Sequence, residues 1–105
     1  MTILGNIVEK VLGGAERKDV DIDAMLAEKA KHNKEHLDWK RSIVDLLKLI
    51  GMEGEADFHH RVTLFKELGG TEHYTGNAIQ NMWMHREVMK KLAENGGKVP
   101  PEWLK

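Results

Sequence analysis

The stretch KHNKEHLDWKRSIVDLLKLI, residues 31–50, decides how many helices the chain forms. As one continuous helix, it would place His32 and His36 one turn apart on the same face, where two imidazoles can share a divalent metal ion. As two helices, it would separate the histidines by a loop, and the pair would lose this geometry. The choice therefore decides both the helix count and whether the sequence carries a candidate metal site.

Residues on either side of the histidines favour a break. Asn33 suits the carboxyl end of one helix, and Asp38 suits the amino end of the next, because an aspartate side chain can accept a hydrogen bond from a free backbone N–H. We therefore predict a loop over residues 33–37 and a helix over residues 39–50, which Gly51 ends.

The same helical pattern continues on both sides of this stretch. Further helices are predicted to begin after Asp19 or Asp21, after Asp57 and at about Asn77. Apolar or buried positions repeat at intervals of three and four residues in all four helices: Ile22, Met25, Leu26 and Ala30; Ile43, Leu46, Leu47 and Ile50; Phe58, Val62, Phe65 and Leu68; Ala78, Met82, His85, Met89 and Leu92. No strand is required. The sequence predicts an all-α fold, a compact bundle of about four helices within residues 20–105.

Residues 1–14 read as a separate amphipathic segment, joined to the helical domain by a polar connector at residues 15–19. Its apolar side chains share one helical stripe: Ile3, Leu4, Ile7, Val8, Val11 and Leu12. Burying such a side chain is worth roughly 1.5 to 3 kcal/mol, so we expect the domain, a second copy or a bilayer edge to cover the stripe. We favour self-association, which makes these six residues interface candidates. A membrane span is not expected, because Glu9 and Lys10 interrupt the stripe, and peripheral membrane contact is disfavoured because no aromatic anchor is present.

Composition excludes several classes of function. A chain of 105 residues fits one domain, and its 16 basic and 17 acidic side chains nearly cancel, which disfavours general binding of nucleic acid. With no cysteine, the chain offers no disulfide or thiolate site, which fits the cytoplasm. The carboxylates are scattered, no phosphate-binding loop is present, and Ser42 is the one serine, so we expect neither an enzyme nor a cofactor.

Two aromatic residues stand where recognition surfaces often place them. Tyr74 lies in a polar loop, and Trp83 lies beside the main apolar stripe of its helix, so both are interface candidates and Trp83 should be partly exposed. Trp39 and Trp103 are better explained as core residues, and His85 as a hydrogen-bonded residue of the core or its boundary.

Three stretches, DWKRSIVDLLKLIG, FKELGG and NMWMHREVMKKLAENGGKVPPEWLK, resemble the bacterial domain-of-unknown-function family 3597 over roughly residues 20–105. The resemblance implies a compact helical domain with no established activity and no assigned catalytic or binding residues. It also implies a loop near Lys34, where family members often have glycine. This chain departs from the family in its connector, which is short and polar rather than rich in alanine and proline.

These observations favour a small soluble helical domain that binds an unknown partner, with self-association as one form of that binding. The alternative is a helical protein that binds a divalent metal through its histidines, with His32 and His36 as the candidate ligands.

Overall fold

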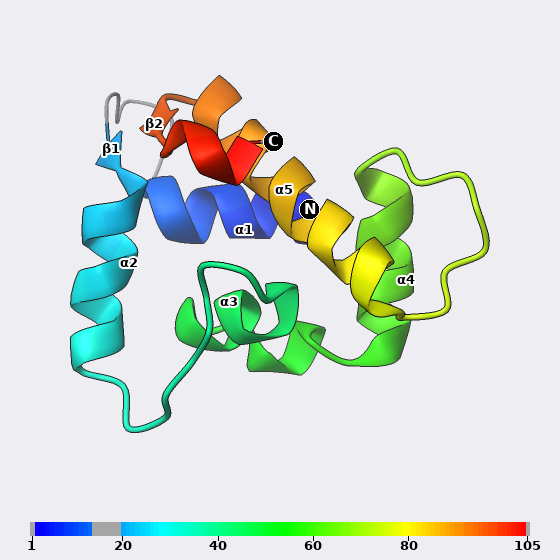
Figure 1. Cartoon of the computed structure of the whole chain (residues 1–105), viewed down its shortest axis with the longest axis horizontal. Coiled ribbons are helices and arrows are strands. Elements are labelled where there is room, and N and C mark those ends of the chain that lie inside the picture. Colours follow the sequence, from blue (N-terminus) through cyan, green and yellow to red (C-terminus); the bar gives the residue numbers. More distant parts are fainter. Residues whose placement is uncertain (1, 14–19, 105) are drawn as a thin grey trace.

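The computed structural model describes residues 2–13 and 20–104, so the predicted connector at residues 15–19 lies outside the described residues. Within these ranges the chain forms five α-helices, two short 3-10 helices and one pair of two-residue strands (Figure 1). In chain order they are α1 (Ile3–Leu12), β1 (Val20–Asp21), α2 (Ile22–Lys31), α3 (Ile43–Leu49), η1 (Glu53–Glu55), α4 (Phe58–Glu67), α5 (Ala78–Glu94), β2 (Gly97–Lys98) and η2 (Pro101–Leu104). The predicted all-α class is therefore confirmed.

Side-chain caps start the helices largely where the sequence places them. Asp21, Asp57 and Asn77 each accept a hydrogen bond from a backbone N–H in the first turn of α2, α4 and α5. Residues 33–37 are non-helical, as predicted, but the loop is longer and runs from His32 to Ser42. The predicted helix over residues 39–50 is shortened accordingly.

Asp38 was predicted to cap that helix, and this is wrong. The carbonyl oxygen of Asp38 accepts hydrogen bonds from Arg41 and Ser42 in a turn, and Ser42 Oγ caps α3 by accepting from the Asp45 N–H at 3.2 Å. The Asp45 carboxylate in turn accepts the Asp38 N–H at 2.8 Å. The turn directs Trp39 into the core, so a helix starting at Trp39 does not form.

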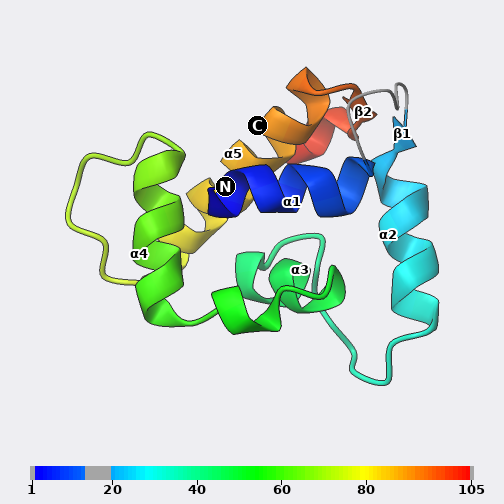
Figure 2. The same ribbon diagram turned by 180° about the vertical axis from the view of Figure 1, so that it is seen from behind.

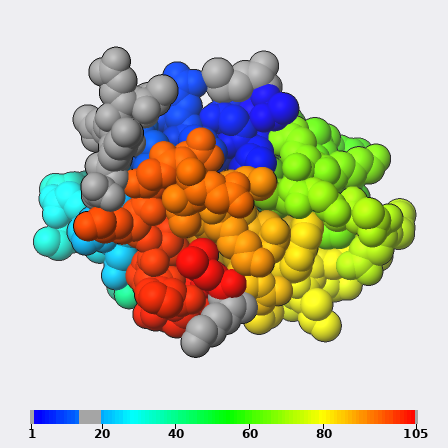
Figure 3. Space-filling view, turned by 90° about the horizontal axis from the view of Figure 1, so that it is seen from above, coloured from blue at the N-terminus to red at the C-terminus, as the bar shows by residue number. Residues whose placement is uncertain are grey.

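Helix α1 lies in the middle of the molecule rather than at its edge. Figures 1 and 2 place it between α2 and α4, and it packs against α4 and α5. Figure 3 shows α1 beside the carboxyl half of α5, with one side of the helix open on that face. Helix α1 and the rest of the helical domain therefore share one core.

The carboxylate of Glu67, at the end of α4, holds the amino end of α1. It accepts hydrogen bonds from the backbone N–H groups of Ile3 at 3.3 Å and Leu4 at 2.8 Å, while Thr2 Oγ1 accepts from Gly5. A negative charge is favourable at a helix amino end, where the macrodipole is positive. This contact joins residues more than sixty positions apart, and no spacing in the sequence points to it.

A short parallel bridge, which the sequence does not predict, pairs Val20 with Gly97 and Asp21 with Lys98. Gly97 is required for close packing, because a Cβ there would lie 2.9 Å from side-chain atoms of Ile22 and from the carbonyl oxygen of Leu92. The bridge brings the start of α2 against the end of α5. From there the chain leads into η2, which packs on α5 and places Trp103 against the core, as predicted.

Candidate binding site

The amino half of α5 carries the most exposed large apolar side chains in the described part of the chain. Ile79 is 80% exposed and Met82 is 58% exposed. The predicted core position of Met82 is wrong, because the buried side of α5 is formed by Gln80, Met84, His85, Val88, Met89 and Leu92. These residues follow the helical period along a face rotated away from Met82.

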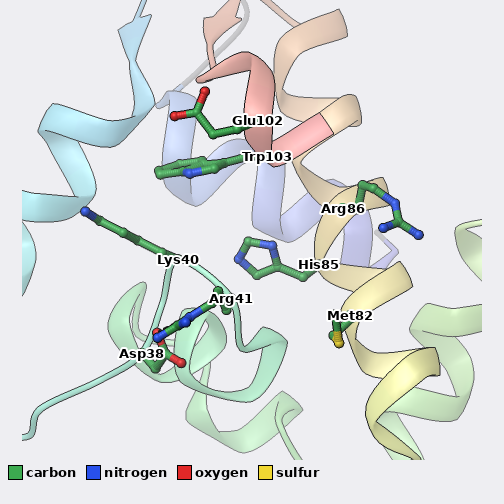
Figure 4. Close-up of a pocket in the computed structure, with 8 residues that line it drawn as sticks. All are labelled: Asp38, Lys40, Arg41, Met82, His85, Arg86, Glu102 and Trp103. Atoms are coloured by element: carbon green, nitrogen blue, oxygen red, sulfur yellow. Dashed lines mark hydrogen bonds and ion pairs between the residues drawn. The ribbon is translucent and has the colours of Figure 1, made fainter. Parts of the chain in front are cut away.

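Beside Met82 lies an open pocket of about 490 Å³ between α5, the loop at residues 38–41 and η2 (Figure 4). This volume is in the range of ordinary ligand sites, which hold about 300 to 1,000 Å³. Eight residues line it: Asp38, Lys40, Arg41, Met82, His85, Arg86, Glu102 and Trp103. The three segments are distant in sequence and meet only in the fold.

Aromatic side chains and His85 fix one side of the pocket. The rings of Trp39 and Trp103 meet edge to face with their centroids 5.8 Å apart, which joins η2 to the loop. His85 is buried, and its Nε2 lies 2.8 Å from the carbonyl oxygen of Trp39. Because a carbonyl oxygen only accepts, Nε2 carries the proton, and Nδ1 of the neutral ring is an acceptor. Burial lowers the pKa of His85, against smaller opposing contributions from the Trp39 hydrogen bond and the charge of Asp38.

Charged side chains surround the opening. Arg41 Nε pairs with Asp38 Oδ1 at 3.3 Å, and the Lys40 ammonium lies 5.5 Å from the centre of the Trp39 ring. Arg86 lines the pocket from α5, and Glu102 lines it from η2. Within residues 2–13 and 20–104, no carboxylate lies within ion-pair distance of the Lys40 ammonium. Lys40 is therefore available to an anionic ligand.

The six apolar residues of α1, proposed from sequence as an interface, have a different environment. Ile7 is fully buried, and Val11 and Leu12 are nearly so, while Ile3, Leu4 and Val8 are partly buried against the same core. The predicted interface role of Ile7, Val11 and Leu12 is therefore wrong, because α4 and α5 of the same chain already cover these side chains. The apolar surface that motivated self-association is mostly satisfied within one molecule.

The prediction of Tyr74 as an interface residue is also wrong. Its side chain is only 4% exposed, although its loop is polar. Its ring packs between those of Phe58 and Phe65, and its hydroxyl is hydrogen-bonded to Arg61 and Asn81. Burial raises the pKa of Tyr74, against the opposing effect of the Arg61 charge. These partners come from α4 and α5, and the loop sequence gives no sign of them.

Trp83 is partly exposed, as predicted, with its ring centroid 5.3 Å from that of Phe65. It lines a second, smaller hollow of about 320 Å³, formed with Gly69 and Gly70. It therefore does not contribute to the pocket in Figure 4.

The candidate metal ligands are exposed side chains at the end of α2. His32 Nε2 lies 3.3 Å from Glu28 Oε1, and this hydrogen bond is the main cause of a lowered pKa for Glu28. His36 lies beyond the end of the helix, in the loop. No group of three or more histidine, aspartate and glutamate side chains in the described ranges is arranged to hold a metal ion.

Sequence reasoning gave four of the lining residues other roles: His85, Met82 and Trp103 in the core, and Asp38 as a helix cap. It missed the remaining four, Lys40, Arg41, Arg86 and Glu102. The available signals were the basic pair Lys40–Arg41 directly after Trp39 and a tryptophan following two prolines. Neither signal shows that these segments meet beside α5.

The fold and pocket define a small helical domain with a ligand-sized hollow. The chain belongs to the family described as "Domain of unknown function (DUF3597)", which matches residues 8–100, so the resemblance drawn from the sequence is confirmed. The match begins within α1, which supports treating that helix as part of the domain.

A solved structure has the same fold. The solution structure of a conserved unknown protein from Rhodopseudomonas palustris is 30% identical in sequence, with a TM-score of 0.76, over 100% of this chain and 99% of that chain. No curated protein matches the chain. Among the described helices, none is long and apolar enough to cross a lipid bilayer.

Proposed function

We propose that this protein is a small cytoplasmic binding module that holds a short segment of another protein in the pocket beside α5. The observation that carries the proposal is the position of Met82, whose exposed side chain forms part of a pocket wall together with Trp103. Single exposed apolar residues are common on protein surfaces. An exposed apolar residue beside an aromatic-lined hollow is the arrangement in which interface residues anchor a partner.

A binding role fits the polar groups of the pocket better than a catalytic one. A catalytic histidine is usually oriented by a carboxylate, whereas His85 bonds to a backbone carbonyl oxygen. The Asp38 carboxylate is paired with Arg41. The polar groups around the opening are suited to fixing the orientation of a bound segment.

The partner is proposed to be another protein rather than a second copy joined through α1. Ile7, Val11 and Leu12 are already covered within one molecule, so pairing through this stripe would require α1 to leave its own core. A partner can contact the exposed residues of α5 without any helix leaving the core.

The proposal is tested by selecting binders from a random peptide library displayed on phage against the full chain. We expect enriched sequences whose binding is lost in Met82→Lys and kept in Phe58→Lys. Phe58 is the matched control, because it is 44% exposed and does not line the pocket. Far-ultraviolet circular dichroism checks that both variants keep their helices.

Absence of any enriched sequence would overturn the proposal. So would enriched sequences that bind Met82→Lys as well as they bind the unchanged chain, because the segment would then lie elsewhere.

A further inference from the structure

We infer that the pocket beside α5 takes an aromatic side chain with a hydrogen-bond donor, a tyrosine or tryptophan of the partner, and that Nδ1 of His85 accepts the bond. This inference rests on the proposed binding function and adds the chemistry of the bound residue. Three observations carry it: an acceptor atom without a partner, its position in the pocket, and the apolar side chains on either side of it.

The acceptor atom is the second ring nitrogen of His85. Nε2 donates to the carbonyl oxygen of Trp39 at 2.8 Å, which leaves Nδ1 of the neutral ring as an acceptor. Within residues 2–13 and 20–104, no group donates to Nδ1, and no side-chain nitrogen or oxygen is both fully buried and without a partner. Nδ1 must therefore reach solvent, although His85 as a whole is only 4% exposed.

The pocket is the place where this nitrogen becomes accessible. His85 is one of the residues that line it, and Figure 4 shows the His85 ring near its centre, between Trp103 and Met82. A few polar groups placed among apolar ones fix the orientation of a ligand in most binding pockets. Burial lowers the pKa of His85, so Nδ1 stays unprotonated near neutral pH and remains an acceptor.

The side chains on either side of His85 suit an aromatic ring. Met82 is 58% exposed, and Trp103 is half-buried. A thioether and an indole both make favourable contacts with aromatic rings. The side chains of tyrosine and tryptophan combine such a ring with one donor group.

A bound residue without a donor would be penalised by the same geometry. A phenylalanine or leucine that filled the pocket would displace solvent from Nδ1 and leave a buried acceptor unpaired, which costs more than the net gain from one hydrogen bond. A site built to pair with a donor therefore rejects a similar side chain that lacks it.

Three capped tripeptides test the inference, each with a central tyrosine, phenylalanine or O-methyltyrosine between two glycines. They are uncharged and differ only at the para position of the ring. Titration into the nitrogen-15-labelled full chain, followed by nuclear magnetic resonance, measures both the affinity and the resonance of Nδ1. We expect the tyrosine peptide to bind about five- to ten-fold more tightly than the other two and to be the one that moves the Nδ1 resonance upfield.

Two histidine variants separate the acceptor from the rest of the pocket. His85→Gln keeps an N–H group that can reach the Trp39 carbonyl oxygen but has no polar atom at the position of Nδ1, so the preference for tyrosine over phenylalanine should disappear. His36→Gln, in the exposed loop after α2, is the matched control and should keep the preference. The Nδ1 resonance of the unchanged chain decides the question even if His85→Gln does not fold.

Equal binding of the tyrosine and phenylalanine peptides, or an Nδ1 resonance that the tyrosine peptide does not move, would overturn the inference. So would an equal shift caused by the phenylalanine peptide, because a backbone N–H would then be the donor. Library sequences that depend on Met82 but lack both tyrosine and tryptophan would also overturn it, and would leave the binding function standing. Failure of the library to yield any sequence dependent on Met82 would instead refute the binding function.

Discussion

Two apolar surfaces, the stripe of α1 and the amino half of α5, look alike in sequence and have opposite environments in the fold. In α1, Ile7 is fully buried between neighbouring helices. In α5, Ile79 and Met82 remain mostly exposed. Helical spacing shows that a face exists, but only the arrangement of the other segments shows which face is covered. The covered surface stabilises the fold, and the exposed surface is the one that we propose binds a partner.

The largest expected effect comes from truncating a buried side chain of α1. Ile7→Ala should lower the free energy of unfolding by about 2 to 5 kcal/mol, because it removes a fully buried side chain and leaves a cavity. Ile79→Ala, at an 80% exposed position, should change it by less than about 0.5 kcal/mol. Urea unfolding measures both.

Light scattering on the same proteins addresses self-association. Equal stability of Ile7→Ala and Ile79→Ala, together with a fall in molecular mass for Ile7→Ala, would restore α1 as an interface between copies. We expect the mass to stay the same.

A smaller effect should follow from loosening α1 at its amino end. Glu67→Ala removes the acceptor of the Ile3 and Leu4 N–H groups and should cost about 1 to 2 kcal/mol, since hydrogen bonds to charged groups at a partly exposed site are worth roughly this much. Glu94→Ala, which removes an exposed ion pair with Lys91, is the control and should cost less than about 0.5 kcal/mol. Thermal unfolding compares the two variants. Equal losses of stability would show that Glu67 does not hold the amino end of α1.

The loop beside Met82 gives the next effect in size. Ser42→Ala should cost about 1 kcal/mol through loss of the α3 cap. Asp38→Ala should cost less than about 0.5 kcal/mol, because the Asp38 side chain makes only an exposed contact with Arg41. The order of these two losses in denaturant unfolding distinguishes the observed start of α3 from a start at Trp39.

The smallest expected effect is a pH dependence of stability that arises from His85, on the buried side of α5. Because burial lowers the pKa of His85 from its ordinary value of 6.5, the unfolded chain binds this proton more readily than the folded chain. The free energy of unfolding should therefore fall as the pH decreases below about 6.5, while this group has no effect well above that pH.

A non-titrating variant isolates the contribution of His85. His85→Gln should lose this part of the pH dependence, and the exposed-site variant His36→Gln should keep it. Identical pH profiles for His85→Gln and the unchanged chain would show that another group is responsible.

Much of the fold could be predicted because local chemistry fixes it. The caps Asp21, Asp57 and Asn77 act through residues three positions away, and the break after α2 follows from similarly local preferences. The face of α5 is harder, because the predicted stripe through Met82, His85 and Met89 overlaps the buried face. His85 and Met89 are buried, whereas a modest rotation of the face leaves Met82 exposed. The sequence alone does not fix that rotation.

The site was beyond prediction for a different reason. Lys40, Met82 and Trp103 are brought together by the packing of η2 on α5 and by the turn that directs Trp39 inward. Tyr74 is buried against the rings of Phe58 and Phe65, and its hydroxyl bonds to Arg61 and Asn81, which lie on two different helices. Such contacts depend on the whole arrangement, and no short pattern encodes them.

The bridge between Val20 and Gly97 has a consequence for the order of folding. In an otherwise unfolded chain, pairing these residues closes a loop of about 77 residues, at an entropic cost of about 4 kcal/mol. A pair of two-residue strands offers only a few hydrogen bonds, each worth about 1 kcal/mol net. The strands should therefore pair after the helices have assembled, so a disruptive change at Gly97 should accelerate unfolding and leave the folding rate almost unchanged.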